Sequence, residues 1–454
     1  MGFIDDNFLL ETDFARSLYH GHAKGVPIVD FHNHLPVKDL CADRIYPDIG
    51  TLWVVADPYK HRAMRLMGLE ENLISGKASP KEKFGAWCGI VPHLAGNPLF
   101  HWSYLEMLRF FDYDGPIDEA HSAFLWEHCN RLLAGKDHSM TGFLKAVNAK
   151  RLTTSDDLLD DTSLHKKASE ATGIDITPSL RGDSILGFSK AFMEKLAPAD
   201  SSLEAFLKAV SERLDSFEAN GCRLSDHSLD DGFTFVSTPG ERAAALFEKL
   251  PDLDTDGLAE LKSFVLEWLG RQYASRKWVM QLHIGAQRHT STRLRSVVGP
   301  AGGYASPGSC LNIRALCDFL DALDSESLLP RTILYNLNPA DNAALANLTG
   351  SFSESGTQKV KFGPAWWFCD HMCGIEANLE TLAAHSLLSQ AVGMTTDSRS
   401  VLSFSRHEYF RRILCNWLGE KVRRGHLPAD ESLLGGIVED ICYSNANKWI
   451  YEQR

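Results

Sequence analysis

Short runs of β-branched and aliphatic residues alternate along the chain with longer stretches in which apolar residues recur at helical spacing. This alternation is typical of β–α units that build a parallel sheet. Eight such runs can be counted, so the pattern predicts an α/β fold, a (β/α)8 barrel of the TIM type. The runs cover residues 26–31, 150–154, 173–178, 221–224, 277–282, 331–336, 358–362 and 391–396.

More than 100 residues separate the first run from the second, which is too long for a bare loop. Residues 60–69, 80–90, 102–111 and 117–133 within this gap carry apolar side chains at helical spacing. We therefore expect one barrel domain over residues 1–454, with residues 37–149 forming a helical insertion subdomain after the first strand.

Ionisable residues follow six of the eight runs. In a barrel of this type the carboxyl ends of the strands carry the active site, so these residues are expected to meet there. Loops are polar in any protein, which is the alternative explanation for one or two of the cases. The six segments are His32-Asn33-His34, Ser155-Asp156-Asp157, Arg181-Gly182-Asp183, Ser225-Asp226-His227, His283-Ile284-Gly285 and Asp397-Ser398-Arg399.

Composition narrows the class of partner. The chain has 46 Lys and Arg against 59 Asp and Glu, a net charge of −13, so nucleic acid is not an expected partner. No apolar run approaches the ~18 residues of a membrane span, and residues 1–10 do not read as a secretory signal. The ten cysteines are scattered without a CxxC pair, which is typical of reduced thiols. We expect a cytoplasmic protein.

His32 and His34 are two positions apart at the end of the first run, so strand alternation places both imidazoles on one face. Two imidazoles that point the same way can bind one divalent metal. Asp397 ends the eighth run, which in a closed barrel lies beside the first, so its carboxylate can join the same metal. The alternatives are two polar residues leaving a strand and an Asp that caps the following helix.

Arg181 and Arg399 are candidates for holding an anionic substrate, because a guanidinium binds a carboxylate in two-pronged fashion. A surface charge or a structural salt bridge is the alternative for Arg181. His283 and His227 follow the fifth and fourth runs. Each can contact the substrate or the metal, or can be a hydrogen-bonded structural histidine.

Two aromatic positions complete the candidate site. Tyr59 can relay a proton if a nearby cation lowers the pKa of its phenol from ~10; otherwise it is a buried aromatic residue. Trp367, next to Trp366 after the seventh run, offers a flat apolar face on which a sugar can stack, although such a pair is more often simply core.

These residues lie in segments that resemble the uronate isomerase (glucuronate isomerase) family of the amidohydrolase superfamily, and the resemblance runs nearly end to end. The C-terminal block, Gly393-Met394-Thr395-Thr396-Asp397-Ser398-Arg399-Ser400 followed by residues 406–412, is the most specific part. The other matching segments are residues 30–35, 59–65, 97–102, 280–286 and 366–368.

The resemblance implies a distorted (β/α)8 barrel with a helical insertion after the first strand. It implies one divalent metal, typically zinc, bound by His32, His34 and Asp397. The implied reaction interconverts D-glucuronate with D-fructuronate and D-galacturonate with D-tagaturonate. In our hypothesis the metal binds the carboxylate and a neighbouring hydroxyl of the hexuronic acid, and Arg181 orients it. Tyr59, activated by Arg399, shuttles a proton through an enediol, while Asp397 bridges the metal and a substrate hydroxyl.

Two segments depart from the family pattern. Pro58 stands where the family usually has His, and residues 287–293 lack the expected Asn-rich pattern. Two other functions use the same barrel. One is a metal-dependent hydrolase in which metal-bound water attacks a lactone, ester or amide. The other is a non-catalytic sugar-acid binding protein, which would have a damaged metal set, and none is visible. The preferred uronate, the native metal and whether the chain forms a homo-oligomer stay open.

Overall fold

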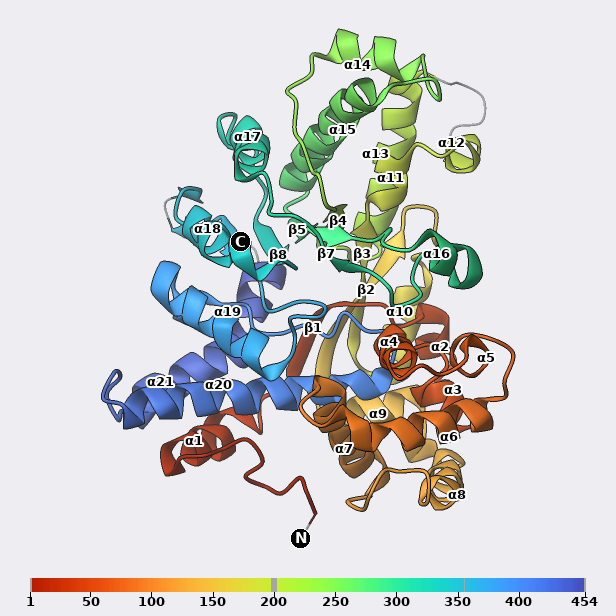
Figure 1. Cartoon of the computed structure of the whole chain (residues 1–454). Helices are drawn as coiled ribbons and strands as arrows, with labels where there is room; N and C mark the ends of the chain where they lie inside the picture. The colour runs from red at the N-terminus through yellow and green to blue at the C-terminus, as the bar shows by residue number, and fades with distance from the viewer. Residues whose placement is uncertain (1, 197–201, 355, 453–454) are drawn as a thin grey trace.

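A parallel sheet of seven strands lies at the centre of the computed structural model, which describes residues 2–196, 202–354 and 356–452 (Figure 1). Every strand pairs in parallel with its neighbours, in the order β1-β2-β3-β4-β5-β8-β11. The sheet curls into part of a barrel, so the expected α/β class is confirmed. The strands are β1 (Ile28–Asn33), β2 (Ala149–Asp157), β3 (Asp175–Arg181), β4 (Leu224–Leu229), β5 (Val279–Ile284), β8 (Thr332–Asn336) and β11 (Val360–Phe362).

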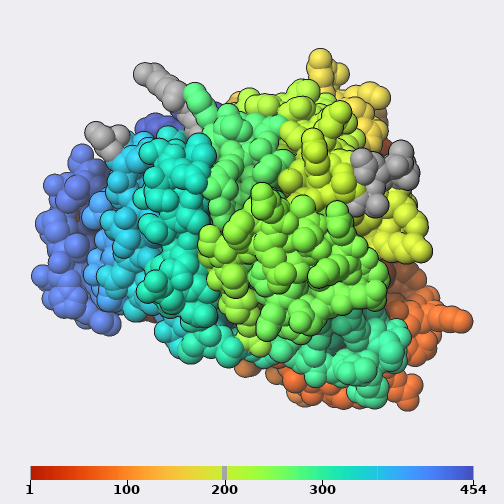
Figure 2. Space-filling view, turned by 90° about the horizontal axis from the view of Figure 1, so that it is seen from above, coloured from red at the N-terminus to blue at the C-terminus, as the bar shows by residue number. Residues whose placement is uncertain are grey.

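Helices join successive strands, as parallel pairing requires. Figure 2 shows that segments coloured green, cyan and blue follow one another across one face in chain order. Within the described residues no helix is both long enough and apolar enough to cross a bilayer. The helices that join strands are α10 (Leu164–Thr172), α11 (Asp183–Gly187), α12 (Lys190–Leu196), α13 (Leu203–Ala219), α14 (Gly240–Phe247), α15 (Thr255–Ser275), α16 (Thr292–Val298), α17 (Ile313–Asp324) and α18 (Asn342–Leu348). Helix α1 (Asp13–Leu18) precedes the first strand, and α19 (Met372–His385), α20 (Ser405–Arg423) and α21 (Glu431–Glu439) follow the last one.

The segment between β1 and β2 is helical and lies on one side of the sheet, where Figure 1 shows it in red to orange. Its interior is aromatic: Trp53 and Trp87 are fully buried with their ring centroids 6.1 Å apart. The segment contains α2 (Val37–Cys41), α3 (Ile49–Trp53), α4 (Pro58–Leu66), α5 (Glu71–Ile74), α6 (Pro80–Ile90), α7 (Pro98–Phe111), α8 (Ser122–Leu133) and α9 (Met140–Ala146). Since α7 also contacts α20, the early and late parts of the chain meet beside the sheet.

Most strands end later than the apolar pattern predicts. The pattern predicts residues 277–282 and 221–224, whereas β5 is Val279–Ile284 and β4 is Leu224–Leu229. The apolar pattern fades before the polar residues at these carboxyl ends, but the backbone ladder continues through them. The polar residues at the carboxyl ends are therefore held within strands.

The predicted eighth strand, residues 391–396, is wrong as a regular strand. Gly393 has φ of 78° and Asp397 has φ of 46°, and a backbone in the left-handed region cannot continue a ladder. The segment is nevertheless fixed beside β1, because Asp397 N donates to His32 O (3.0 Å) and His34 N donates to Ser398 O (2.9 Å). Asp30 adds a clamp by accepting from Thr396 N at 2.9 Å.

The C-terminal segment closes the amino ends of the strands. Ala446 and Ile450 belong to a buried cluster with Val29, Val279 and Ile333, which are strand residues. Hydrogen bonds fix the same segment to strand starts: Thr153 Oγ1 lies 2.6 Å from Tyr451 Oη, and Arg151 Nη1 donates to Asn447 Oδ1 at 2.7 Å. The barrel interior is thus filled at this end, and the opposite end is left for a site.

Shortening a buried side chain of this C-terminal segment is expected to destabilise the whole barrel. Ile450→Ala should lower the free energy of unfolding by about 2–5 kcal/mol, because it opens a cavity where the structure cannot collapse fully. Urea denaturation followed by circular dichroism measures this change. The matched control is Lys448→Ala, an exposed position two residues away, which should change the free energy by less than about 0.5 kcal/mol. Equal free energies of unfolding for the two variants would contradict the proposed role of Ile450 in closing the barrel.

Candidate active site

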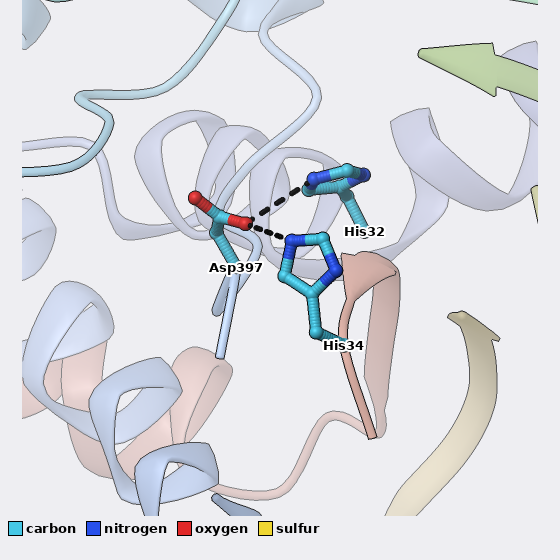
Figure 3. A group of neighbouring side chains, drawn as sticks. All are labelled: His32, His34 and Asp397. Atoms are coloured by element: carbon cyan, nitrogen blue, oxygen red, sulfur yellow. Dashed lines mark hydrogen bonds and ion pairs between the residues drawn. The ribbon is translucent and has the colours of Figure 1, made fainter. Parts of the chain in front are cut away.

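His32, His34 and Asp397 converge at the carboxyl ends of the strands. Asp397 Oδ1 lies 2.8 Å from His34 Nε2 and 3.3 Å from His32 Nε2, and Figure 3 shows one carboxylate oxygen facing both imidazole rings. His32 is almost fully buried, while His34 and Asp397 are partly open. One carboxylate oxygen and two ring nitrogens therefore point at a common position.

A bulge in β1 turns His32 toward this position. The register of β1 against β2 shifts between Asp30 and Asn33. Phe31 packs in the barrel interior, and the next residue, His32, also faces inward at the top of the barrel. Two consecutive residues on one face are what a bulge produces, and bulges commonly re-aim a side chain next to an active site.

Asp397 is held in an unusual backbone conformation. Its φ of 46° lies in the left-handed region, which costs a residue other than glycine free energy. The side chain is fixed by Trp366, whose Nε1 donates to Asp397 Oδ2 at 2.7 Å. The second carboxylate oxygen is thereby occupied, and Oδ1 is left for the two histidines.

The Asp397 carboxylate shifts the pKa values of the two histidines, and they shift its own. Burial would raise the pKa of Asp397, but hydrogen bonds with His32 and His34 outweigh it and hold the pKa well below its ordinary value. Burial lowers the pKa of His34 more than the hydrogen bond to Asp397 raises it. For His32, the hydrogen bond to Asp397 and the charge of Asp226 overcome burial, and its pKa is raised. Asp397 is therefore ionised.

The three residues fit a divalent metal. Two imidazole nitrogens and one carboxylate oxygen are a ligand set typical of mononuclear catalytic sites, and a further position stays open to a substrate oxygen. His32 Nδ1 is buried and has no hydrogen-bond partner among the described residues. It lies 4.0 Å from Asp226 Oδ1, as expected for a ligand whose other ring nitrogen faces an outer carboxylate. A second group, His32 with Asp226 and His283, also brings ligand atoms within 4.8 Å of one another.

A pocket of about 470 Å³ opens above this group. Its wall includes most of the residues that the sequence singles out for the substrate, since Arg181, His283, Trp367, Tyr59 and Arg399 all line it. Three cations lie in the wall, because Arg288 joins the two predicted arginines. A concave site of this size with several guanidinium groups suits a small anion.

His227 is a correction, because it does not line the pocket. Its Nε2 lies 2.8 Å from Tyr273 Oη, and the side chain is fully buried against α15. The preceding residue, Asp226, faces the pocket instead. Alternation along β4 explains why Asp226, and not His227, faces the pocket. Leu224 points into the barrel interior, so Asp226 does also, and His227 points outward.

Tyr59 lines the pocket but is not paired with Arg399, which corrects the predicted activation. Among the described residues, the Tyr59 hydroxyl donates to Asp370, with Oδ2 at 3.0 Å and Oδ1 at 3.1 Å. Burial and the charge of Asp370 raise the pKa of Tyr59 well above its ordinary value. Tyr59 is therefore a neutral phenol.

Asp226 and Arg288 are two of the pocket residues that the sequence does not single out as site residues. Ser155 Oγ and Ser179 Oγ donate to Asp226 at 3.1 and 3.2 Å, and its Oδ2 lies 3.8 Å from Arg181 Nε. The alternation of β4 could have identified Asp226. Arg288 lies in the atypical loop 287–293, where no strand pattern gives a direction to its side chain.

The two segments that depart from the family pattern, Pro58 and the loop 287–293, both lie at the pocket. Pro58 lines the pocket at the first position of α4, where a proline fits because that amide has no partner within the helix. Asp57 caps the helix by accepting from Tyr59 N at 2.9 Å. Arg288 of the loop donates to Asp230 Oδ1 at 2.8 Å and lies over the Trp367 ring. The loop thus still contributes a cation to the wall.

Comparison with known proteins identifies similar chains. The profile of the family described as Glucuronate isomerase matches residues 1–450. A uronate isomerase of Salmonella typhimurium is 42% identical over 471 aligned residues, which cover 98% of each chain. The crystal structure of uronate isomerase from Thermotoga maritima is 30% identical, with a TM-score of 0.93 over 99% of this chain and 100% of that one. The crystal structure of glucuronate isomerase from Caulobacter crescentus, 21% identical, has the same fold, with a TM-score of 0.91 over 99% of this chain and 98% of that one.

Proposed function

The chain belongs to the glucuronate isomerase family of aldose–ketose isomerases that act on uronates, and from this premise we propose that its pocket interconverts D-glucuronate with D-fructuronate and D-galacturonate with D-tagaturonate. The observation that carries the proposal is the convergence of His32, His34 and Asp397 in a pocket that also contains Tyr59 and three arginines. A hexuronic acid offers a carboxylate that the arginines can bind and hydroxyl groups that the other polar side chains of the pocket can bind.

The proposal includes a metal ion at the three converging residues. We propose that His32, His34 and Asp397 bind a divalent cation, with zinc the ion that best suits two imidazoles and one carboxylate. When bound, such a cation supplies positive charge that polarises substrate oxygen atoms. Trp366 keeps the Asp397 carboxylate aimed, since it occupies the other oxygen.

The remaining residues hold the substrate and move one proton. Isomerisation transfers a proton from C2 to C1 through an enediol, so the site must take up a proton, return it and stabilise negative charge on oxygen. Arg181 and Arg399 supply charge for the substrate carboxylate and the developing oxyanion. Tyr59 Oη is the atom that accepts and returns the proton, and Trp367 offers a flat wall to the sugar chain.

The neutral state of His283 suits the same role. Burial and the neighbouring His32 lower its pKa well below the ordinary value, and its ring stacks on Tyr335 with centroids 4.6 Å apart. Its Nε2 is buried and has no hydrogen-bond partner in the part of the chain that the structure describes, so it can bond a substrate hydroxyl. His283 serves as a neutral hydrogen-bonding group at the floor of the pocket.

The proposal extends to the insertion and to the compartment. The helical segment 37–149 serves as an insertion subdomain that contributes Tyr59 and Tyr46 to the pocket wall. All ten cysteines lie in the described residues and are free thiols, which supports a reducing compartment such as the cytoplasm.

A single experiment tests the activity. The metal-replete protein is incubated with D-glucuronate, and separately with D-galacturonate, in D₂O, and NMR follows ketose formation and deuterium uptake. We expect ketose to form from at least one acid. Deuterium should enter at C1 whenever the shuttled proton exchanges with solvent. Absence of turnover of both acids, with hydrolysis of a sugar-acid lactone or ester instead, would replace the isomerase proposal with the hydrolase.

A further inference from the structure

A buried ion pair lies behind Tyr59. Arg406 Nη1 donates to Asp370 Oδ2 at 2.9 Å, and both residues are buried. Tyr59 is in the pocket wall, whereas neither partner of the ion pair is among the described residues that line the pocket. Asp370 therefore cannot touch the substrate, but it touches the residue that does.

The hydrogen bonds of the Tyr59 hydroxyl show which group receives its proton. A phenol has one proton to donate and can accept at its oxygen. The proton is directed to Asp370, whose two oxygens lie 3.0 and 3.1 Å from Tyr59 Oη. Phe368 N donates to the same phenol oxygen at 3.3 Å. What Tyr59 offers to the pocket is therefore an acceptor lone pair.

Arg406 fixes the carboxylate from the other side. Its guanidinium lies 4.6 Å from the centroid of the Trp102 ring and 5.5 Å from that of Tyr59, so it is stacked within an aromatic wall. It belongs to the first turn of α20, while Asp370 precedes α19 and Tyr59 begins α4. Three elements far apart in the chain thus meet at one hydroxyl group.

We infer that Asp370, anchored by Arg406, is a positioning residue that orients the Tyr59 hydroxyl and receives its proton during isomerisation. The inference rests on the proposed function. As a substrate proton passes to Tyr59 Oη, the hydroxyl proton of Tyr59 passes to a carboxylate oxygen of Asp370. Both protons return when the substrate carbon is reprotonated, so no further reactant is needed. Burial raises the pKa of Asp370 despite the charge of Arg406, which favours proton uptake.

The competing explanation is an ion pair that only joins the segment before α19 to α20. A double-mutant cycle separates the two, because a residue that acts through Tyr59 has no further effect once the phenol is gone. The variants are Asp370→Asn, Tyr59→Phe and the two combined. The matched control is Glu408→Gln on α20, which removes another carboxylate that pairs with Arg109 and Arg412 away from the pocket.

We expect Asp370→Asn to lower kcat about 10- to 100-fold, with KM and metal content near wild type. The combined variant should be no slower than Tyr59→Phe alone, and Glu408→Gln should lower Tm without lowering kcat. Asp370→Glu, which keeps an ionised acceptor, should recover part of the loss. If Asp370→Asn does not fold, the same cycle is run with Asp370→Glu.

Two results would overturn the inference. One is an Asp370 variant with wild-type kcat and a lowered Tm; the other is a combined variant whose loss in kcat is the product of the two single losses. Both presuppose that the wild-type protein turns over a uronate. Absence of turnover by the wild-type protein would instead overturn the proposed function, and this inference with it.

Discussion

Replacement of Asp397 by asparagine is expected to abolish isomerase activity and metal binding together. Asparagine tolerates the left-handed backbone conformation at this position, so the substitution changes charge without adding strain. Loss of an outer partner of a ligand already weakens metal binding about 10- to 100-fold, and loss of the ligand itself should weaken it more. We expect kcat/KM to fall at least about 10³-fold, because removing even one preorganised hydrogen-bond donor costs about 10²–10³.

Metal content after dialysis and ketose formation by NMR measure the two effects on the same preparation. The matched control is Asp318→Asn, a half-exposed carboxylate that pairs with Arg314 on the surface of α17. It should retain wild-type metal content and turnover. An Asp397→Asn variant with unchanged metal and turnover would remove this carboxylate from the proposed metal set.

Tyr59→Phe is expected to have the second largest effect, and to separate proton transfer from metal binding. The variant keeps the aromatic ring in the pocket wall but loses the oxygen that accepts and returns the proton. Removal of a positioned acid–base group typically costs about 10²–10⁴ in rate, so kcat should fall by that order while metal content stays constant. KM should change much less, because the arginines that hold the carboxylate are untouched.

Steady-state kinetics with both uronates, together with metal analysis, tests this expectation. Tyr46→Phe is the matched control, since Tyr46 also lines the pocket and its variant loses the same hydroxyl group. It should turn over at close to the wild-type rate. Normal turnover by Tyr59→Phe would exclude Tyr59 from the proton transfer and leave its hydrogen bond to Asp370 as a structural feature.

The convergence of His32, His34 and Asp397 could be predicted from the chain because it depends on strand order alone. Segments that follow one another in a parallel β–α pattern commonly lie side by side, and in a closed barrel the last lies beside the first. The predicted strand at 391–396 is wrong in its local geometry, yet Asp397 N still bonds to His32 O. The neighbour relationship survives even though the regular ladder is lost.

The partners of Tyr59 could not be predicted in the same way. Its hydroxyl meets Asp370 and the Arg406 ion pair through the packing of α4 against loops and helices that follow the last strand. No periodicity in the chain records such a contact. The expected partner, Arg399, is near in sequence to the metal carboxylate, but the structure directs a more distant cation to the phenol.

The sequence by itself determined the α/β class, the strand order, the family and the residue types gathered at the carboxyl ends of the strands. These follow from local periodicity and from motifs, which the chain carries position by position. Only the tertiary structure decided where the side chain of Arg288 points and which charge meets Tyr59. The bulge in β1 and the left-handed turn at Asp397 arise from packing between distant segments. Contacts of that kind have no local signal in the chain.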